Sequence, residues 1–230
     1  MNPSANGRPA GRLLEIRVGR PQAMARPDWD HHPNRHWVSA YRKEPVLGAV
    51  RLGETGLDGD EVHDRRVHGG PTMAVLAYAA AHYPRWREEL GIAEMGPGGF
   101  GENLVVDGFD ESRVAIGDVW TVGTAKLCVS QPRGPCANIS RRWDRKDLLA
   151  RVNETHRTGW YLSVPQPGEI AAGDTIALVE RPHPDWTIER ILRLRAEPAT
   201  DPEGVAELTR LPALTPAWRD HFARLTTRAR

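Results

Sequence analysis

The strongest constraint on the fold is a series of short apolar runs separated by turn signals. Two of the turns carry a Gly-Asp pair, at Gly117-Asp118 and Gly173-Asp174. Short runs broken in this way are typical of a small β-barrel and not of a parallel sheet covered by helices. The sequence therefore predicts a mainly β protein with helices, built on an irregular barrel. The expected strands cover residues 13–19, 46–52, 102–106, 119–122, 126–130, 160–164 and 175–180.

Two segments in the first half depart from the strand pattern. Residues 20–38 contain three prolines and the His31-His32 pair, which predicts a long loop or insertion. Residues 72–91 have the one convincing helical pattern of the first two thirds. Pro71 suits a first helical turn, Pro84 predicts a kink or a restart, and Gly91 suits the end of the helix.

The sequence pattern changes from strand-like to helical after Arg181-Pro182-His183-Pro184. Beyond this point helical patterns cover 186–195, 202–210 and 216–228, and Asp201 and Thr215 each precede a proline at an expected first helical position. We therefore expect a barrel domain at 1–184 and a three-helix appendage at 185–230. The appendage should pack on the barrel, have marginal stability of its own and hold no catalytic group.

Composition limits the compartment and the partners. A formal charge of +1 gives no reason to expect binding to nucleic acid or to a membrane. Two cysteines cannot form a disulfide framework, and no apolar stretch in residues 1–12 is typical of a secretory signal. These features predict a cytoplasmic protein.

The residues most informative about function are 130–138, which read Ser-Gln-Pro-Arg-Gly-Pro-Cys-Ala-Asn. Two prolines stiffen this segment and Gly134 leaves one flexible joint, so the preceding strand ends in an elbow. The elbow holds the Cys136 thiol beside Arg133, and a nearby guanidinium favours the thiolate, which is a nucleophile or a soft metal ligand. The alternative for Cys136 is a buried, inert cysteine in a turn. Cys128 lies within an expected strand, between Leu127 and Val129, and we expect it to be a small packing residue.

A second segment, residues 64–72, places Gly69 and Gly70 just before the expected helix. Backbone N–H groups at a helix N-terminus, with Arg65, Arg66 and His68 nearby, could cradle an anion. No Gly-Lys-Ser/Thr follows, so the segment is not a phosphate-binding P-loop. The alternative is a tight turn with solvated charges.

A third segment, residues 98–104, is a glycine-rich approach to a strand. Glycine there allows a ligand to approach the backbone closely. Glu102 and Asn103 could hydrogen-bond a heterocycle, or Glu102 could transfer a proton; the alternative is a β-bulge with two surface polar residues. Residues 157–161 could form the wall of a pocket or belong to the core.

Other site chemistries find less support. No spacing of histidines and cysteines matches a zinc site, and neither zinc nor pyridoxal phosphate is expected. Cys136, His68 and a carboxylate could form a thiol triad, but such a triad depends on a geometry that the sequence does not show.

Taken together, an ordered set of motifs resembles the MOSC domain, in particular the YiiM-type members that carry a C-terminal three-helix extension. The resemblance covers about residues 11–225. The motifs are Lys43-x-Pro45, Gly59-Asp60, Val67-His68-Gly69-Gly70-Pro71, Ala74-Val75, Phe100-Gly101-Glu102-Asn103-Leu104, Ile116-Gly117-Asp118, Gln131-Pro132-Arg133-x-Pro135-Cys136 and Gly159-Trp160-Tyr161.

The resemblance implies a barrel that binds molybdenum cofactor (molybdopterin), with Cys136 as the thiolate ligand of the metal. It also implies reduction of N-hydroxylated compounds, with hydroxylaminopurine-type base analogues as the best-known substrates. Catalytic roles then fall to Cys136, His68 and Glu102. The residues expected to bind the cofactor are Lys43, Arg65, His68, Gly69, Gly70, Asn103, Arg133 and Cys136.

A second interpretation does not include reduction of a substrate. The chain could be a carrier of molybdenum cofactor, or a sulfur-transfer module that uses a persulfide on Cys136. For the reductase, no G-x-G-x-x-G fingerprint lies on an expected strand-to-helix turn, and two cysteines cannot hold an iron–sulfur cluster. We therefore expect a separate redox protein as electron donor.

Overall fold

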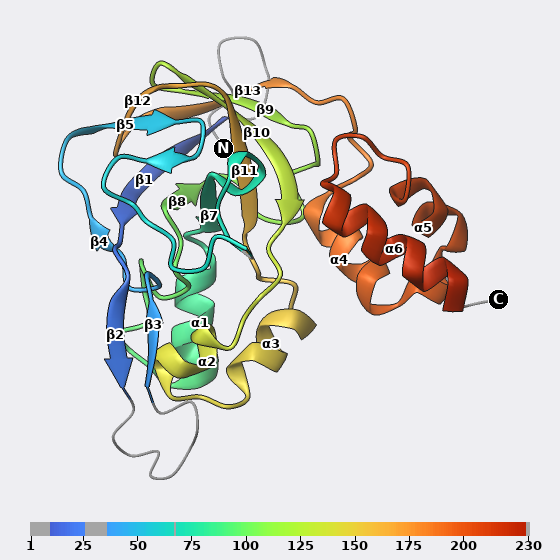
Figure 1. Cartoon of the computed structure of the whole chain (residues 1–230), viewed down its shortest axis with the longest axis horizontal. Coiled ribbons are helices and arrows are strands. Elements are labelled where there is room, and N and C mark those ends of the chain that lie inside the picture. The colour runs from blue at the N-terminus through green and yellow to red at the C-terminus, as the bar shows by residue number, and fades with distance from the viewer. Residues whose placement is uncertain (1–9, 26–35, 67, 229–230) are drawn as a thin grey trace.

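The computed structural model describes residues 10–25, 36–66 and 68–228, and its main body is a closed β-barrel (Figure 1). Seven strands follow one another in the order β13-β9-β10-β11-β7-β8-β1, and β1 pairs back with β13. Only the β7–β8 pair among these is parallel. The strands are β1 (Ala10–Val18), β7 (Val75–Ala79), β8 (Leu104–Asp107), β9 (Val119–Val122), β10 (Ala125–Pro132), β11 (Trp160–Gln166) and β13 (Thr175–Glu180). The predicted irregular barrel is confirmed.

Smaller strands extend the barrel. β4 (Glu44–Pro45) pairs with the end of β1, and β12 (Gly168–Ala171), β5 (Ala49–Gly53) and β6 (Gly56–Leu57) form a three-stranded sheet. β2 (Gln22–Ala25) and β3 (His36–Ser39) form an antiparallel hairpin, so the prediction of a loop throughout 20–38 is wrong at these strands. Residues 26–35, which include His31 and His32, lie outside the described residues.

The single helix predicted for residues 72–91 is wrong. The segment forms a short 3₁₀ turn (Pro71–Met73), the buried strand β7 and then helix α1 (His82–Leu90). All five residues of β7 are buried, and a continuous apolar run cannot be assigned to helix or strand by periodicity alone. Residues 75–79 form a strand because they pair with β8 and β11.

Both ends of α1 follow from sequence signals. Of the kink or restart predicted at Pro84, the structure shows the restart, since α1 begins at His82. Pro84 is the third residue of the helix, where a missing backbone N–H leaves no hydrogen bond unmade. Gly91 ends the helix in the left-handed conformation, with φ of 67°, as predicted. Two short helices after the elbow, α2 (Asn138–Trp143) and α3 (Leu148–Glu154), were not predicted.

Three helices complete the chain and lie to one side of the barrel, with α4 beside β10 (Figure 1). They are α4 (Ile188–Ala196), α5 (Pro202–Leu208) and α6 (Pro216–Arg228). The Asp201 carboxylate accepts a hydrogen bond from Gly204 N at 2.8 Å and caps α5 as predicted. The Thr215 hydroxyl instead donates to the Gln131 side chain at 2.7 Å, which ties the start of α6 to the end of β10.

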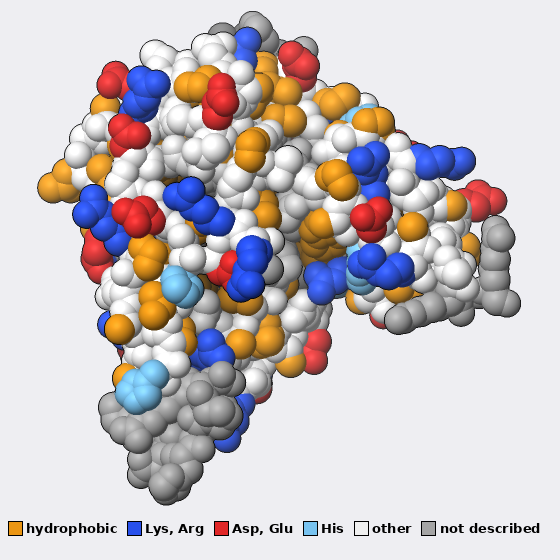
Figure 2. Space-filling view, viewed as in Figure 1, with side chains coloured by type: hydrophobic (Ala, Val, Ile, Leu, Met, Phe, Trp, Pro, Cys, Tyr) orange, Lys and Arg blue, Asp and Glu red, His pale blue; other side chains and the backbone are white. Residues whose placement is uncertain are grey.

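One hydrophobic core continues from the barrel into the three helices. Its members include Trp120 and Leu127 of the barrel and Ile191 and Phe222 of the helices, all 0 or 1% exposed. A second cluster, around Tyr78, Trp86 and Phe100, lies between α1 and the barrel. On the face seen in Figure 2, acidic and basic side chains are interspersed, and a recess separates the lower barrel from the helices. No helix in the described parts of the chain is long and apolar enough to span a bilayer.

Candidate functional site

A cavity of about 300 Å³ opens beside Cys136, where several loops meet. The loop after β3, the long connection between β6 and β7, the approach to β8 and the elbow after β10 all contribute to it. Its walls come from residues 38–41 and 43, 60–64, 68 and 69, 74 and 76, 101 and 103, 133, 134, 136 and 138, and from Tyr161. The topology of the barrel thus brings together segments that are far apart in the sequence.

The elbow forms as predicted. β10 ends at Pro132, and residues 133–136 run without regular structure into α2. The Arg133 backbone N donates to Gly159 O at 3.1 Å, which fixes the elbow against the start of β11. The Cys136 thiol is half-buried and lines the cavity. Cys128 is also half-buried, and burial raises the pKa of its thiol, which disfavours the thiolate.

Arg133 is the most unusual charged residue of the site. It lines the cavity while only 3% exposed, and its guanidinium lies 6.0 Å from the centre of the Tyr41 ring. Burial alone would lower the pKa of Arg133, but Tyr41 and Cys136 nearby hold it above its ordinary value. Its Nη1 atom has no hydrogen-bond partner among the described residues. A buried cation with an unused N–H group favours an anion in the cavity.

Lys43 also lines the cavity, but its charge is already paired. Its Nζ contacts the Asp60 carboxylate, and both side chains are 8% exposed. Asp60 accepts further hydrogen bonds from Gly19 N at 2.7 Å and from Asn103 Nδ2 at 2.9 Å. The Asn103 Oδ1 in turn accepts from Leu76 N at 3.1 Å. Burial lowers the pKa of Lys43, and Asp60 opposes that shift.

The residues 64–70 only partly match the predicted anion cradle. His68 and Gly69 line the cavity, whereas Arg65 is exposed and neither it nor Gly70 lines it. The glycines lead into a 3₁₀ turn and a strand, so the predicted helix N-terminus at this place is wrong. Burial, and secondarily Arg133, lowers the pKa of His68 and favours a neutral imidazole at neutral pH.

Glu102 does not line the cavity. It is fully buried and its carboxylate binds the glycine-rich loop, because it accepts from Gly98 N, from Phe100 N at 2.9 Å and from the Tyr83 hydroxyl at 2.6 Å. Burial raises the pKa of Glu102, and these donors partly oppose the rise. The contacts are those of a residue that holds a loop in shape.

Tyr41, Asp60 and Asn138 line the cavity, although the sequence assigned no role to their side chains. Asp60 and Asn138 do lie in segments with a sequence signal, the Gly59-Asp60 turn and residues 130–138, whereas Tyr41 has none. Tyr161 lines it as well, from the segment 157–161 that could have been wall or core. Arg157 belongs instead to the core, where it stacks 3.8 Å from the centre of the Trp86 ring and pairs with Glu89. No three His, Cys, Asp or Glu side chains cluster as metal ligands in the described ranges.

The barrel, the elbow cysteine and the loops around it identify the family. The chain belongs to the MOSC domain family, whose model matches residues 64–177, the part that carries the glycine loops and the elbow. A second model, the YiiM-like 3-alpha helix domain, matches residues 186–225, so the chain is a YiiM-like member with its three C-terminal helices.

Similar proteins span most of the chain. Protein YiiM of Escherichia coli is 36% identical over 186 residues, covering 78% of this chain and 81% of that protein. The uncharacterized protein YflK of Bacillus subtilis is 31% identical over 210 residues, covering 91% and 92%. A Gibberella moniliformis protein named "Reductase" is 36% identical over 210 residues, covering 88% of this chain but only 35% of that longer protein.

Solved structures agree with the fold. The crystal structure of YiiM from Geobacillus stearothermophilus superposes with a TM-score of 0.77 at 28% identity, covering 94% of this chain and 99% of that one. The crystal structure of YiiM from E. coli gives a TM-score of 0.72 at 30% identity, covering 82% and 90%. The fold therefore extends over both the barrel and the C-terminal helices.

Proposed function

We propose that the chain binds molybdenum cofactor in the Cys136 cavity and reduces N-hydroxylated compounds, such as hydroxylaminopurine base analogues, to amines. The observation that carries the proposal is a half-buried thiol in the same cavity as a buried guanidinium whose Nη1 atom has no hydrogen-bond partner among the described residues. Membership of the MOSC family and the relative named "Reductase" support an oxidoreductase.

The residues of the cavity fit the chemistry of the cofactor. A thiolate suits a soft metal, and a pterin that carries a phosphate needs cationic partners. When bound, the cofactor supplies the two-electron chemistry that amino-acid side chains lack. Cys136 would hold the metal, and Arg133 would hold negative charge on the cofactor or on the substrate oxygen.

Other residues would orient the ligands. The neutral imidazole of His68 can donate or accept one hydrogen bond at the cavity wall, which suits proton transfer to a leaving oxygen. Asn103 and Lys43 would act mainly through Asp60, which holds both in place. Glu102 supports the loop before β8 and would position Asn103 without touching a ligand.

Metal content and turnover test the proposal. The wild type and the variants Cys136→Ala and Cys128→Ala would be purified anaerobically, analysed for molybdenum and assayed for 6-hydroxylaminopurine reduction with a chemical reductant. We expect molybdenum and turnover in the wild type and in Cys128→Ala, and loss of both in Cys136→Ala. Retention of both by Cys136→Ala would refute the proposal.

The same measurements distinguish the alternative, which rests on the partial exposure of Cys136. A carrier of molybdenum cofactor would hold the metal without turnover. A sulfur-transfer module would show a persulfide on Cys136 and no molybdenum. A cysteine hydrolase has less support, because no histidine hydrogen-bonds to Cys136 within the described residues.

A further inference from the structure

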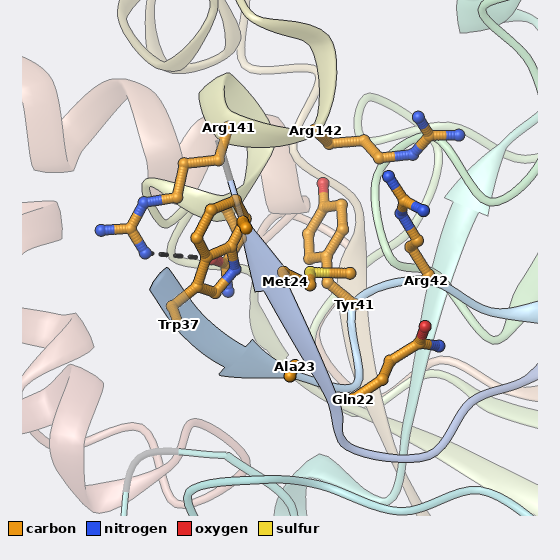
Figure 3. Close-up of a pocket in the computed structure, with 10 residues that line it drawn as sticks. Gln22, Ala23, Met24, Trp37, Tyr41, Arg42, Arg141 and Arg142 are labelled. Carbon is orange, nitrogen blue, oxygen red and sulfur yellow. Dashed lines mark hydrogen bonds between the residues drawn. The ribbon is translucent and has the colours of Figure 1, made fainter. Parts of the chain in front are cut away.

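A second, smaller cavity of about 210 Å³ adjoins the Cys136 cavity, and Tyr41 and Asn138 line both. Its walls are the β2–β3 hairpin on one side and α2 on the other (Figure 3). Because the two cavities share part of their walls, one extended ligand could reach from one into the other. We call the second cavity the arginine pocket, since Arg42, Arg141 and Arg142 line it.

Two of these arginines face each other. The guanidinium groups of Arg42 and Arg142 lie side by side in Figure 3, and neither forms an ion pair with a described residue. Arg142 lies over the Trp143 ring, 4.7 Å from its centre. Burial, and then the positive charge of Arg42, lowers the pKa of Arg142, while Glu44 opposes the shift. A doubly charged anion between the two guanidinium groups would remove this repulsion.

The rest of the pocket is aromatic and partly apolar. Arg141 donates to Asn138 Oδ1 at 3.3 Å and lies 5.2 Å from the centre of the Trp37 ring. Met24 and Tyr41 also line the pocket and are drawn between Trp37 and the two facing arginines in Figure 3. A charged end with an aromatic and apolar wall suits a phosphate that is attached to an organic group.

We propose that the arginine pocket binds the phosphate monoester of a ligand whose other end lies in the Cys136 cavity. Paired guanidinium forks bind a phosphate dianion by several charge-assisted hydrogen bonds at once. Two ligands of the proposed function carry a phosphate monoester, and to that extent the inference rests on that function. One ligand is the pterin cofactor, and the other is an N-hydroxylated purine nucleotide with its 5′-phosphate.

The test compares the full-length wild type with the double variant Arg42→Ala/Arg142→Ala. The control is Arg51→Ala/Arg85→Ala, which removes two exposed arginines that line neither cavity. Molybdenum content is measured in each, together with the affinity for adenosine 5′-monophosphate and for adenosine by isothermal titration calorimetry. Where turnover is present, KM is compared for N-hydroxyadenosine and its 5′-monophosphate.

The outcomes distinguish a cofactor phosphate from a nucleotide phosphate in the arginine pocket. Loss of molybdenum in the double variant alone assigns the pocket to the cofactor's phosphate. Retained molybdenum with a loss of roughly tenfold or more in affinity for the monophosphate, and no change for adenosine, assigns it to a nucleotide. Unchanged metal content and unchanged nucleotide affinity would overturn the inference. If no form of the chain holds molybdenum or reduces a substrate, the proposed function fails, but the calorimetric comparison still decides whether the pocket binds phosphate.

Discussion

At the residue scale, the charged groups near Cys136 differ in how many partners they already have. Lys43 is paired with Asp60, and the Glu102 carboxylate accepts hydrogen bonds from three donors. Arg133 is as buried as these two but keeps an unpartnered N–H group. Since an unpaired buried donor costs free energy until a ligand satisfies it, Arg133 is the residue best prepared to bind an anion.

The environment of Glu102 predicts a structural effect from its substitution. In Glu102→Gln an amide N–H₂ group replaces one acceptor oxygen, so one donor of the loop loses its partner. We expect the free energy of unfolding to fall by about 1–3 kcal/mol while bound molybdenum is retained. Chemical denaturation would measure the change, with the exposed Glu88→Gln on α1 as the control. Unchanged stability together with lost turnover would instead assign Glu102 a part in the chemistry.

At the element scale, the site depends on how β11 begins. Gly159 has φ of 77°, its N–H donates to Glu111 Oε1 at 2.7 Å, and its carbonyl accepts from Arg133 N. A Cβ atom at this position would lie 2.5 Å from Ala77 O on the neighbouring strand β7. The glycine therefore allows β7, β11 and the elbow to lie close together.

Gly159→Ala should accordingly destabilise the barrel and disturb the elbow. Gly91→Ala is the matched control, because Gly91 also has a positive φ but its Cβ would meet nothing within 4 Å. Gly91→Ala should lower the free energy of unfolding by about 1–2 kcal/mol, because alanine is strained in the left-handed conformation. Gly159→Ala should lower it by more. Thermal unfolding of the two variants checks this order. Equal midpoints would show that β7 and β11 can move apart without cost.

At the scale of the whole molecule, the continuous core argues against independent unfolding of the C-terminal helices. Ile191 is fully buried in the core that also contains barrel residues, and Ile188 N donates to Val114 O at 2.8 Å. We expect a single unfolding transition, followed both by circular dichroism and by tryptophan fluorescence. Ile191→Ala should lower the free energy of unfolding by about 2–5 kcal/mol. Two separate transitions would support an appendage that folds on its own.

The chain has no described segment of the kind that binds a dinucleotide electron donor. Gly96, Gly98 and Gly101 have the spacing G-x-G-x-x-G, but they lie between α1 and β8, on a helix-to-strand connection and not on the strand-to-helix turn that binds a dinucleotide. We expect the purified, cofactor-loaded chain not to oxidise NADPH unaided and to need a separate redox protein or a chemical reductant. Absorbance at 340 nm would follow the reaction, and sustained NADPH consumption by the isolated chain would contradict the expectation.

The sequence by itself determined the features that depend on local chemistry. Glycine and aspartate at the turns predicted the barrel, two prolines around Gly134 predicted the elbow, and Asp201 before Pro202 predicted the start of α5. Each of these signals acts within a few residues, because it restricts φ or supplies a nearby hydrogen-bond acceptor.

Only the tertiary structure decided the features that depend on distant partners. Residues 75–79 became a strand because β8 and β11 pair with them, and the Glu102 carboxylate does not line the cavity because two N–H groups of its own loop and the Tyr83 hydroxyl of α1 bind it. Lys43 meets Asp60 across seventeen residues of chain, and Arg65 remains in solvent although it is close in sequence to His68. Burial and pairing between distant segments set these outcomes, and no local pattern of residues encodes them.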